Sequence, residues 1–261
     1  MARACGGALL FSFPLLMTME MWSLGVSVDR VRLLIFLIVS APMLLGLSYF
    51  AGFEPTFRLK DEVLDALAAF GVGCVLSALL LWLFGVLEQH LTARHTIGKI
   101  VLCAIPAALG ALLASKQMGE RDPSTRRRAA DCGPFGQLFL MSVGAMFLAF
   151  NVAPTEEMIL IAYQMDAGQA LILMLASIGL LHAFVYSLGF PGEARRREAG
   201  GFLRTFIGFT APGYGVALIS SLFLLWTFGR TDGVALHEIA TMTIVLGFPA
   251  ALGAATARLV I

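Results

Sequence analysis

Two glutamates, Glu20 and Glu157, interrupt long apolar stretches of this chain, and each follows a threonine by two residues, Thr18 and Thr155. A charged side chain at the centre of a membrane helix costs roughly 2.5–3.5 kcal/mol and usually marks an ion or proton path. Carboxylate, hydroxyl and carbonyl oxygens together suit a hard cation or a proton. These four residues are therefore the first candidates for chemistry.

An internal repeat makes the two glutamates equivalent. Shifted by 137 positions, "GALLFSFPLLMTMEM" (7–21) aligns with "GAMFLAFNVAPTEEM" (144–158), and the match continues through the next apolar segment. "LLWLFG" (80–85) corresponds to "LLWTFG" (224–229) at an offset of 144, and "PAALGA" (106–111) recurs at 249–254. This pattern predicts a tandem duplication that places both acids at the same depth.

The second copy also predicts a broken helix. Pro154 cannot continue a helix, so one helix should end near Asn151, and the next should begin at "PTEEM" with Glu156 in its first turn. Broken helices with freed carbonyls are a known way to build a transport site. Pro14 aligns with Asn151 and not with Pro154, which predicts that the two breaks do not superimpose. The simpler alternative is that the acids are solvated at an interfacial helix start.

A second candidate lies later in the chain. His182 falls inside an apolar segment, with Tyr186 one helical turn further on, and this pair is able to relay protons. The equivalent position in the first copy is Leu45, so His182 is not part of the duplicated design. A histidine packed in the core is the alternative.

The elements that must position these residues are membrane helices. Hydrophobic residues make up 59% of the 261 residues and charged residues 13%, against about 25% charged in soluble domains. Apolar runs of about 18–25 residues without alternation indicate helices and not barrel strands, which predicts an all-α polytopic membrane protein. The first run follows Arg3 without a cleavage site like A-x-A, so we expect it to remain as a span. Small residues in "PAALGA" and "GAMFLAF" predict close helix contacts.

Eight spans are predicted, and they form two tandem four-helix repeats that run parallel through the membrane. The spans cover about 6–25, 32–53, 64–87, 98–115, 136–154, 169–190, 206–228 and 237–260. The repeats occupy 1–115 and 136–261, and a basic linker, 116–135, joins them. Thirteen Lys and Arg residues fall on the side of the termini and five on the other, so both termini should be cytoplasmic.

The motifs "LLFSFPLLMTMEMW" and "FNVAPTEEM" resemble those of an uncharacterised family of bacterial integral membrane proteins, along the whole chain. The resemblance implies a multi-pass protein of the bacterial inner (plasma) membrane and carries no activity. The acid-bearing broken helices are also similar to those of cation–proton exchangers, by analogy only.

These observations leave three functional hypotheses, of which an intramembrane enzyme with His182 and the acids as catalysts is the third and is supported by no catalytic constellation. The first is a cation or proton-coupled transporter or channel. Its ion-binding candidates are Glu20, Glu156, Glu157, Thr18, Thr155 and Asn151, with His182 and Tyr186 as secondary candidates. The second is a non-transporting membrane scaffold or accessory subunit. No enzyme activity, cofactor or nucleic-acid partner is expected, because no Ser/His, metal-histidine or C-x-x-C constellation occurs. Membrane lipids, a cation or proton, and a second copy or a membrane complex are the expected partners.

Overall fold

The computed structural model describes residues 2–51, 59–87, 92–117, 133–188, 203 and 205–260. All regular structure in these residues is helical. Seven of the described helices are long and apolar enough to cross a membrane. They cover Arg30–Phe50, Lys60–Leu83, Ala93–Leu113, Pro134–Val152, Ala167–Tyr186, Phe206–Thr227 and Leu236–Ala257. The prediction of an all-α membrane protein is therefore confirmed.

The first predicted span, about 6–25, is not among these seven candidate spans. It is divided into α1 (Ala2–Leu16) and α2 (Met19–Ser27). At 1.5 Å per residue, α1 reaches about 22 Å, which is shorter than the roughly 30 Å of a bilayer core. Among the described residues, the other seven predicted spans each correspond to one candidate span.

The chain divides into two compact units. Unit 1 comprises Met1–Thr125 with Val260–Ile261, and unit 2 comprises Arg126–Leu259. Most of the predicted linker, residues 118–132, lies outside the described part of the chain.

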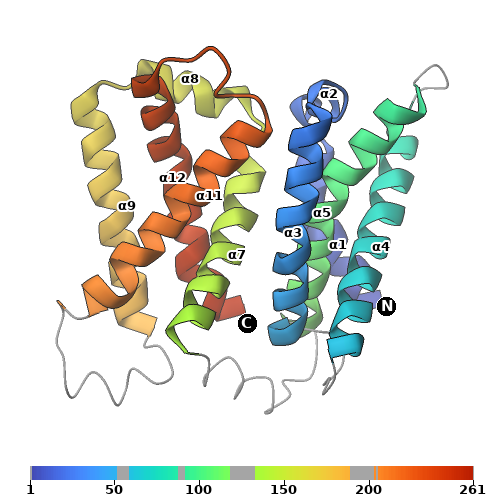
Figure 1. Ribbon diagram of the computed structural model, residues 1–261, viewed down its shortest axis with the longest axis horizontal. Helices are drawn as coiled ribbons and strands as arrows, with labels where there is room; N and C mark the ends of the chain where they lie inside the picture. The colour runs from blue at the N-terminus through green and yellow to red at the C-terminus, as the bar shows by residue number, and fades with distance from the viewer. Residues whose placement is uncertain are drawn as a thin grey trace. The chain divides into compact units, whose positions relative to one another are not determined.

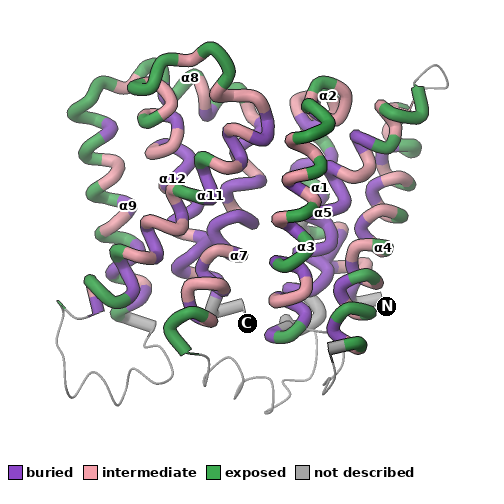
Figure 2. The backbone as a smooth tube through the Cα atoms, viewed as in Figure 1, coloured by how far each residue is buried: buried purple, intermediate pink, exposed green. Residues whose placement is uncertain are grey.

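Unit 1 is built around α5 (Ala93–Gln117). This helix packs against α1, α2, α3 (Arg30–Ala51) and α4 (Leu59–Leu83), and it is the most buried candidate span of the unit. Its alanine-rich buried face allows the neighbouring helices to approach closely (Figure 2). Within the unit, α1 leads from the amino terminus to the end where α2 lies and where α4 connects to α5 (Figure 1).

Unit 2 contains α7 (Pro134–Val152), α8 (Glu156–Gln164), α9 (Ala167–Leu188), the π-helical turn η1 (Phe206–Thr210), α11 (Ala211–Thr227) and α12 (Leu236–Val260). The short helix α8 lies across the end of the unit where α7 stops and α9 begins (Figure 1). The connection from α11 to α12 lies at the same end. Helix α7 packs against α11.

Two glycines bring the backbones of α7 and α12 into contact. A Cβ atom on Gly144 would overlap the carbonyl oxygen of Gly253, and a Cβ on Gly253 would overlap the carbonyl oxygen of Gly144. Only the absence of both side chains permits this crossing. The predicted role of "GAMFLAF" and "PAALGA" in close packing is confirmed at this contact in unit 2.

Helices α4 and α11 end in the same way. Gly85 and Gly229 adopt φ values of 71° and 72°, a left-handed conformation that favours glycine. The amide of Gly85 bonds to the Trp82 carbonyl, and the amide of Gly229 bonds to the Trp226 carbonyl. The next amide in each chain segment reaches back five residues, which completes a Schellman motif at both sites. These terminations fix where the chain turns back at this end of each unit.

Candidate functional site

Breaks between two helices position the predicted acids. In unit 1 the chain leaves α1 after Leu16, and in unit 2 it leaves α7 after Val152. Thr18 and Thr155 then adopt extended backbone conformations and cap α2 and α8. The Thr18 hydroxyl donates to the Leu15 carbonyl at 2.9 Å, and the Thr155 hydroxyl donates to the Val152 carbonyl at 2.8 Å. The amide of each threonine bonds to the same carbonyl, so each hydroxyl is a second donor to a carbonyl in the last turn of the preceding helix.

The predicted break near Pro154 is confirmed, but the prediction that the two breaks do not superimpose is wrong. Pro14 lies inside α1, and the break follows it by three residues, at Met17. A proline inside a helix removes one backbone hydrogen bond without ending the helix when packing holds both sides. As a result, α2 and α8 begin 137 residues apart and end 137 residues apart, at the offset that aligns the two sequences.

The acids lie in the first turns of these short helices. Glu20 is half-buried in α2, whereas Glu156 and Glu157 are exposed in α8. A carboxylate is favourable there because the amino end of a helix carries partial positive charge. Asn151 is half-buried at the end of α7 and donates to the Phe147 carbonyl at 2.8 Å. Among the described residues, no group of three or more His, Cys, Asp or Glu side chains could hold a metal ion.

The sequence did not predict two side-chain N–H groups that donate hydrogen bonds to backbone carbonyls at the breaks. The Trp22 indole donates to the Leu16 carbonyl at 2.7 Å in unit 1. The Arg230 guanidinium donates to the Pro154 carbonyl at 2.7 Å in unit 2. Arg230 directly follows Gly229, the glycine at the end of α11. The sequence does not indicate that it binds the Pro154 carbonyl, because the two residues are 76 positions apart.

Another buried cation supports the same end of unit 1. Lys99 is 8% exposed, and its ammonium donates to the Val86 carbonyl at 3.1 Å, directly after the Schellman motif of α4. Lys99 and Arg230 therefore both bind backbone carbonyls where the chain leaves a helix. In this position a cation complements the negative partial charge of free carbonyls.

Helix α8 is also held by a contact to α12. The Tyr163 hydroxyl donates to a carboxylate oxygen of Glu238 at 3.4 Å. Local desolvation and the neighbouring Glu238 carboxylate raise the pKa of Tyr163. The phenol therefore remains a hydrogen-bond donor at neutral pH.

The second predicted pair does come together. The rings of His182 and Tyr186 are stacked, with centroids 6.0 Å apart and an interplanar angle of 26°. His182 is buried, and its Nδ1 lies 2.8 Å from the hydroxyl of Thr210, on η1. Sequence reasoning missed Thr210, because it is 28 residues from His182 and lies on a separate helix.

Comparison with known proteins identifies the family but no activity. Among curated proteins none matches this chain, and no solved structure matches it either. The family described as "Putative integral membrane protein (DUF2391)" matches residues 1–261, which is the whole chain. The resemblance carried by the "NVAPTEEM" motif is thereby confirmed. The chain belongs to this family of multi-pass integral membrane proteins.

Proposed function

We propose that this protein moves a cation or protons across the membrane and that the interrupted helix of each unit, α1–α2 in unit 1 and α7–α8 in unit 2, binds the transported ion. This proposal rests on one observation: the two breaks have the same local structure. Each has an extended threonine cap, a hydroxyl bonded to the carbonyl three residues earlier, and an acid in the first turn that follows. Interrupted helices with polar groups at the break are typical of ion-coupled transporters.

A duplicated four-helix unit supports this reading. The bounds of α3 and α9 differ by 137 at both ends, as do those of α2 and α8. The Schellman glycines differ by 144, the offset of the third apolar segments. In this proposal α1, extended by α2, makes an eighth crossing, and the two units run parallel. The charge bias of the connectors then places both termini in the cytoplasm of a bacterial cell and α2 and α8 on the outer side.

The acids would attract and release the transported cation. Glu20 and Glu157 occupy equivalent second positions of α2 and α8, and the threonine oxygens keep lone pairs free after donating their protons. A half-buried carboxylate such as Glu20 interacts more strongly with a cation than a fully solvated one. Glu156 has no acidic counterpart, since Met19 stands at the equivalent position.

A non-transporting scaffold or accessory subunit is the second candidate, and one observation favours it. Carbonyls freed at both breaks are already bound by the chain's own donors, Trp22 and Arg230. In a scaffold these contacts would fix the bend at each break and bind no ion. Partners would then be a second copy of the chain or another membrane protein.

Reconstituted flux separates the two candidates. In proteoliposomes we expect cation- or proton-dependent flux, and we expect the double variant Glu20→Gln, Glu157→Gln to lose it by about tenfold or more, because each acid stabilises the ion by at least about 1.4 kcal/mol. Asp166→Asn is the matched control, since it removes an exposed acid directly before α9 that is not an ion-binding candidate. Unchanged flux in the double variant would refute the role of the acids, and a wild type without flux would favour the scaffold.

The proposed topology gives an independent expectation. In a background without native cysteines, Asp166→Cys and Gly233→Cys should react with a membrane-impermeant maleimide added outside intact cells. Ala129→Cys and Ala199→Cys should react only after the membrane is permeabilised, because positively charged connectors stay in the cytoplasm. Labelling of Ala129→Cys from outside would overturn the assignment of the cytoplasmic side.

A further inference from the structure

Unit 2 buries a cluster of polar side chains where α9, η1 and α11 meet. His182 Nδ1 lies 2.8 Å from Thr210 Oγ1, and the two residues are 7% and 0% exposed. Tyr214, one turn after Thr210, is 5% exposed, and its hydroxyl has no hydrogen-bond partner among the described residues. Ser177 lies beside the Tyr214 hydroxyl and donates its own proton to the Leu173 carbonyl at 2.7 Å. Buried polar groups in a membrane segment are costly and are usually functional.

A widened helical turn presents Thr210 to this cluster. In η1 the amide of Ala211 bonds to the Phe206 carbonyl, five residues back, so the turn is wider than an α-helix. Pro212 explains the widening, because proline lacks an amide proton and its ring would clash with the carbonyl four residues earlier. The ring centroids of Phe206 and His182 are 5.6 Å apart. The first and last residues of the turn, Phe206 and Thr210, therefore both lie against the histidine. Such π-turns often occur at functional sites.

Unit 1 forms the corresponding helices without these groups. At offsets of 137 and 144 in the proposed repeat, apolar residues stand in place of the histidine, the threonine, the proline and the tyrosine, namely Leu45, Ala66, Ala68 and Phe70. Helix α4 continues through the last three of these positions as a regular α-helix. Only Ser177 keeps its counterpart, Ser40. The helix contact therefore needs none of the four groups, and their joint presence at one site points to a separate role.

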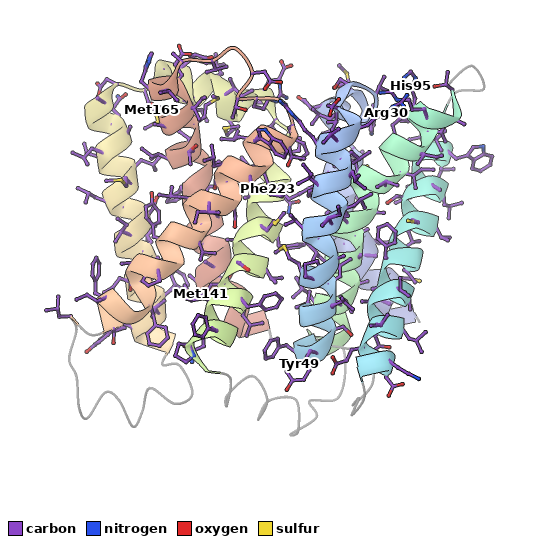
Figure 3. The ribbon with its side chains drawn as sticks, in the orientation of Figure 1. Arg30, Tyr49, His95, Met141, Met165 and Phe223 are labelled. Atoms are coloured by element: carbon purple, nitrogen blue, oxygen red, sulfur yellow. The ribbon has the colours of Figure 1, made fainter. Side chains whose placement is uncertain are left out.

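Among the described residues, aromatic rings also pack against His182. Tyr186 stacks on it from α9, and Tyr214 on α11 is the other titratable side chain that the structure places at this junction. From α7, the Met141 thioether packs against the backbone at Gly213, next to Tyr214. Met141 lies in the half of unit 2 away from Met165, which follows α8 (Figure 3). His182 is 15 residues from the start of α9, so the cluster is about 22 Å along the helix from the end that carries α8.

We propose that His182 and Thr210 form a proton-binding site inside unit 2. The proton adds to the lone pair of the imidazole ring and creates an imidazolium, whose Nδ1–H donates to the Thr210 oxygen. The hydroxyl of Thr210 supplies the oxygen atom that replaces water at Nδ1 of the new charge. As the coupling site for transport, this cluster rests on the proposed function; as a titrating site, it stands without it.

Histidine NMR tests the site directly, without any flux. Full-length protein in lipid nanodiscs, with His90, His95 and His237 changed to glutamine, carries ¹³C,¹⁵N-labelled His182 as its one histidine. We expect the ring ¹⁵N shifts of His182 to change from those of a neutral imidazole to those of an imidazolium as the pH falls from about 8 to about 4. In Thr210→Ala the same change should require a lower pH, because the imidazolium loses the oxygen that accepts from its Nδ1–H.

Thr227→Ala is the matched control on the same helix. Thr227 is also fully buried, but its hydroxyl donates to the Phe223 carbonyl at 2.8 Å and has no contact with His182. The midpoint should not move in this variant. Ring shifts that stay constant from about pH 4 to pH 8 would identify His182 as a neutral core residue and overturn the proposal. Equal midpoints in the Thr210→Ala and Thr227→Ala variants would overturn the role of Thr210.

The same preparations separate this proposal from the transport function. A His182 that titrates in a protein without flux supports the proton site and overturns transport. A protein that shows flux but whose His182 does not titrate supports transport and overturns the proton site. If both hold, His182→Leu, which installs the residue of unit 1, should abolish the proton dependence of flux, whereas Thr227→Ala should retain it.

Discussion

Replacing Gly144 with alanine is expected to destabilise the folded protein by about 3 kcal/mol, and replacing it with leucine should leave no folded protein to recover. The added Cβ would overlap the Gly253 carbonyl oxygen, which belongs to the backbone of α12 and cannot rotate away. The two helices would have to separate along their crossing, so the loss extends beyond one residue. Thermal unfolding of purified protein, followed by size-exclusion chromatography, measures both effects.

Gly215 is the control for this experiment. It lies inside α11, and a Cβ built there meets nothing within 4 Å. Alanine at this site should be neutral or should stabilise the helix by about 0.5–1 kcal/mol, since glycine is a poor helix former. If Gly144→Ala and Gly215→Ala unfold at the same temperature, the close crossing of α7 and α12 is wrong.

Replacing Arg230 with methionine is expected to cost about 2 kcal/mol and to loosen the break between α7 and α8. The variant keeps most of the length of the side chain but removes the donor to the Pro154 carbonyl, which is buried and has lost its helical partner. Hydrogen–deuterium exchange should become faster in the first turn of α8, which begins at Glu156. The comparison of exchange rates with those of the wild type measures the effect.

Two further variants show whether the guanidinium itself matters. Arg94→Met removes an exposed arginine in the first turn of α5 and should leave exchange in α8 unchanged. Arg230→Lys keeps the charge but loses the planar fork, so we expect partial protection of α8. Equal exchange in Arg230→Met and Arg94→Met would show that the hydrogen bond to Pro154 does not hold the break.

The break in unit 2 could be predicted because its cause is local. Pro154 cannot donate a hydrogen bond, and Thr155 followed by two acids is a typical helix start. The break in unit 1 was harder to place, because Pro14 lies three residues before it and is tolerated inside α1. There the new helix begins after the extended Thr18 and not at the proline.

In the candidate site, too, contacts within one helix could be predicted and contacts between helices could not. The pairing of His182 with Tyr186 could be predicted because the residues are one helical turn apart. The contact with Thr210 could not, and neither could that of Arg230 with Pro154, because each joins separate helices. Seven of the eight predicted spans were recovered because the bilayer thickness sets the length of a span and its apolar core requires apolar residues. Both properties can be read from the sequence.

By itself, the sequence determined that this is an all-α membrane protein, where its long helices lie and where Glu156 begins a new helix in unit 2. Only the tertiary structure decided which helix faces meet: Gly144 against Gly253, Arg230 against the Pro154 carbonyl and His182 against Thr210. The physical reason lies in the solvent. In water a polar face separates the outside of a helix from its core, but in lipid both faces are apolar, so periodicity does not reveal the contacts.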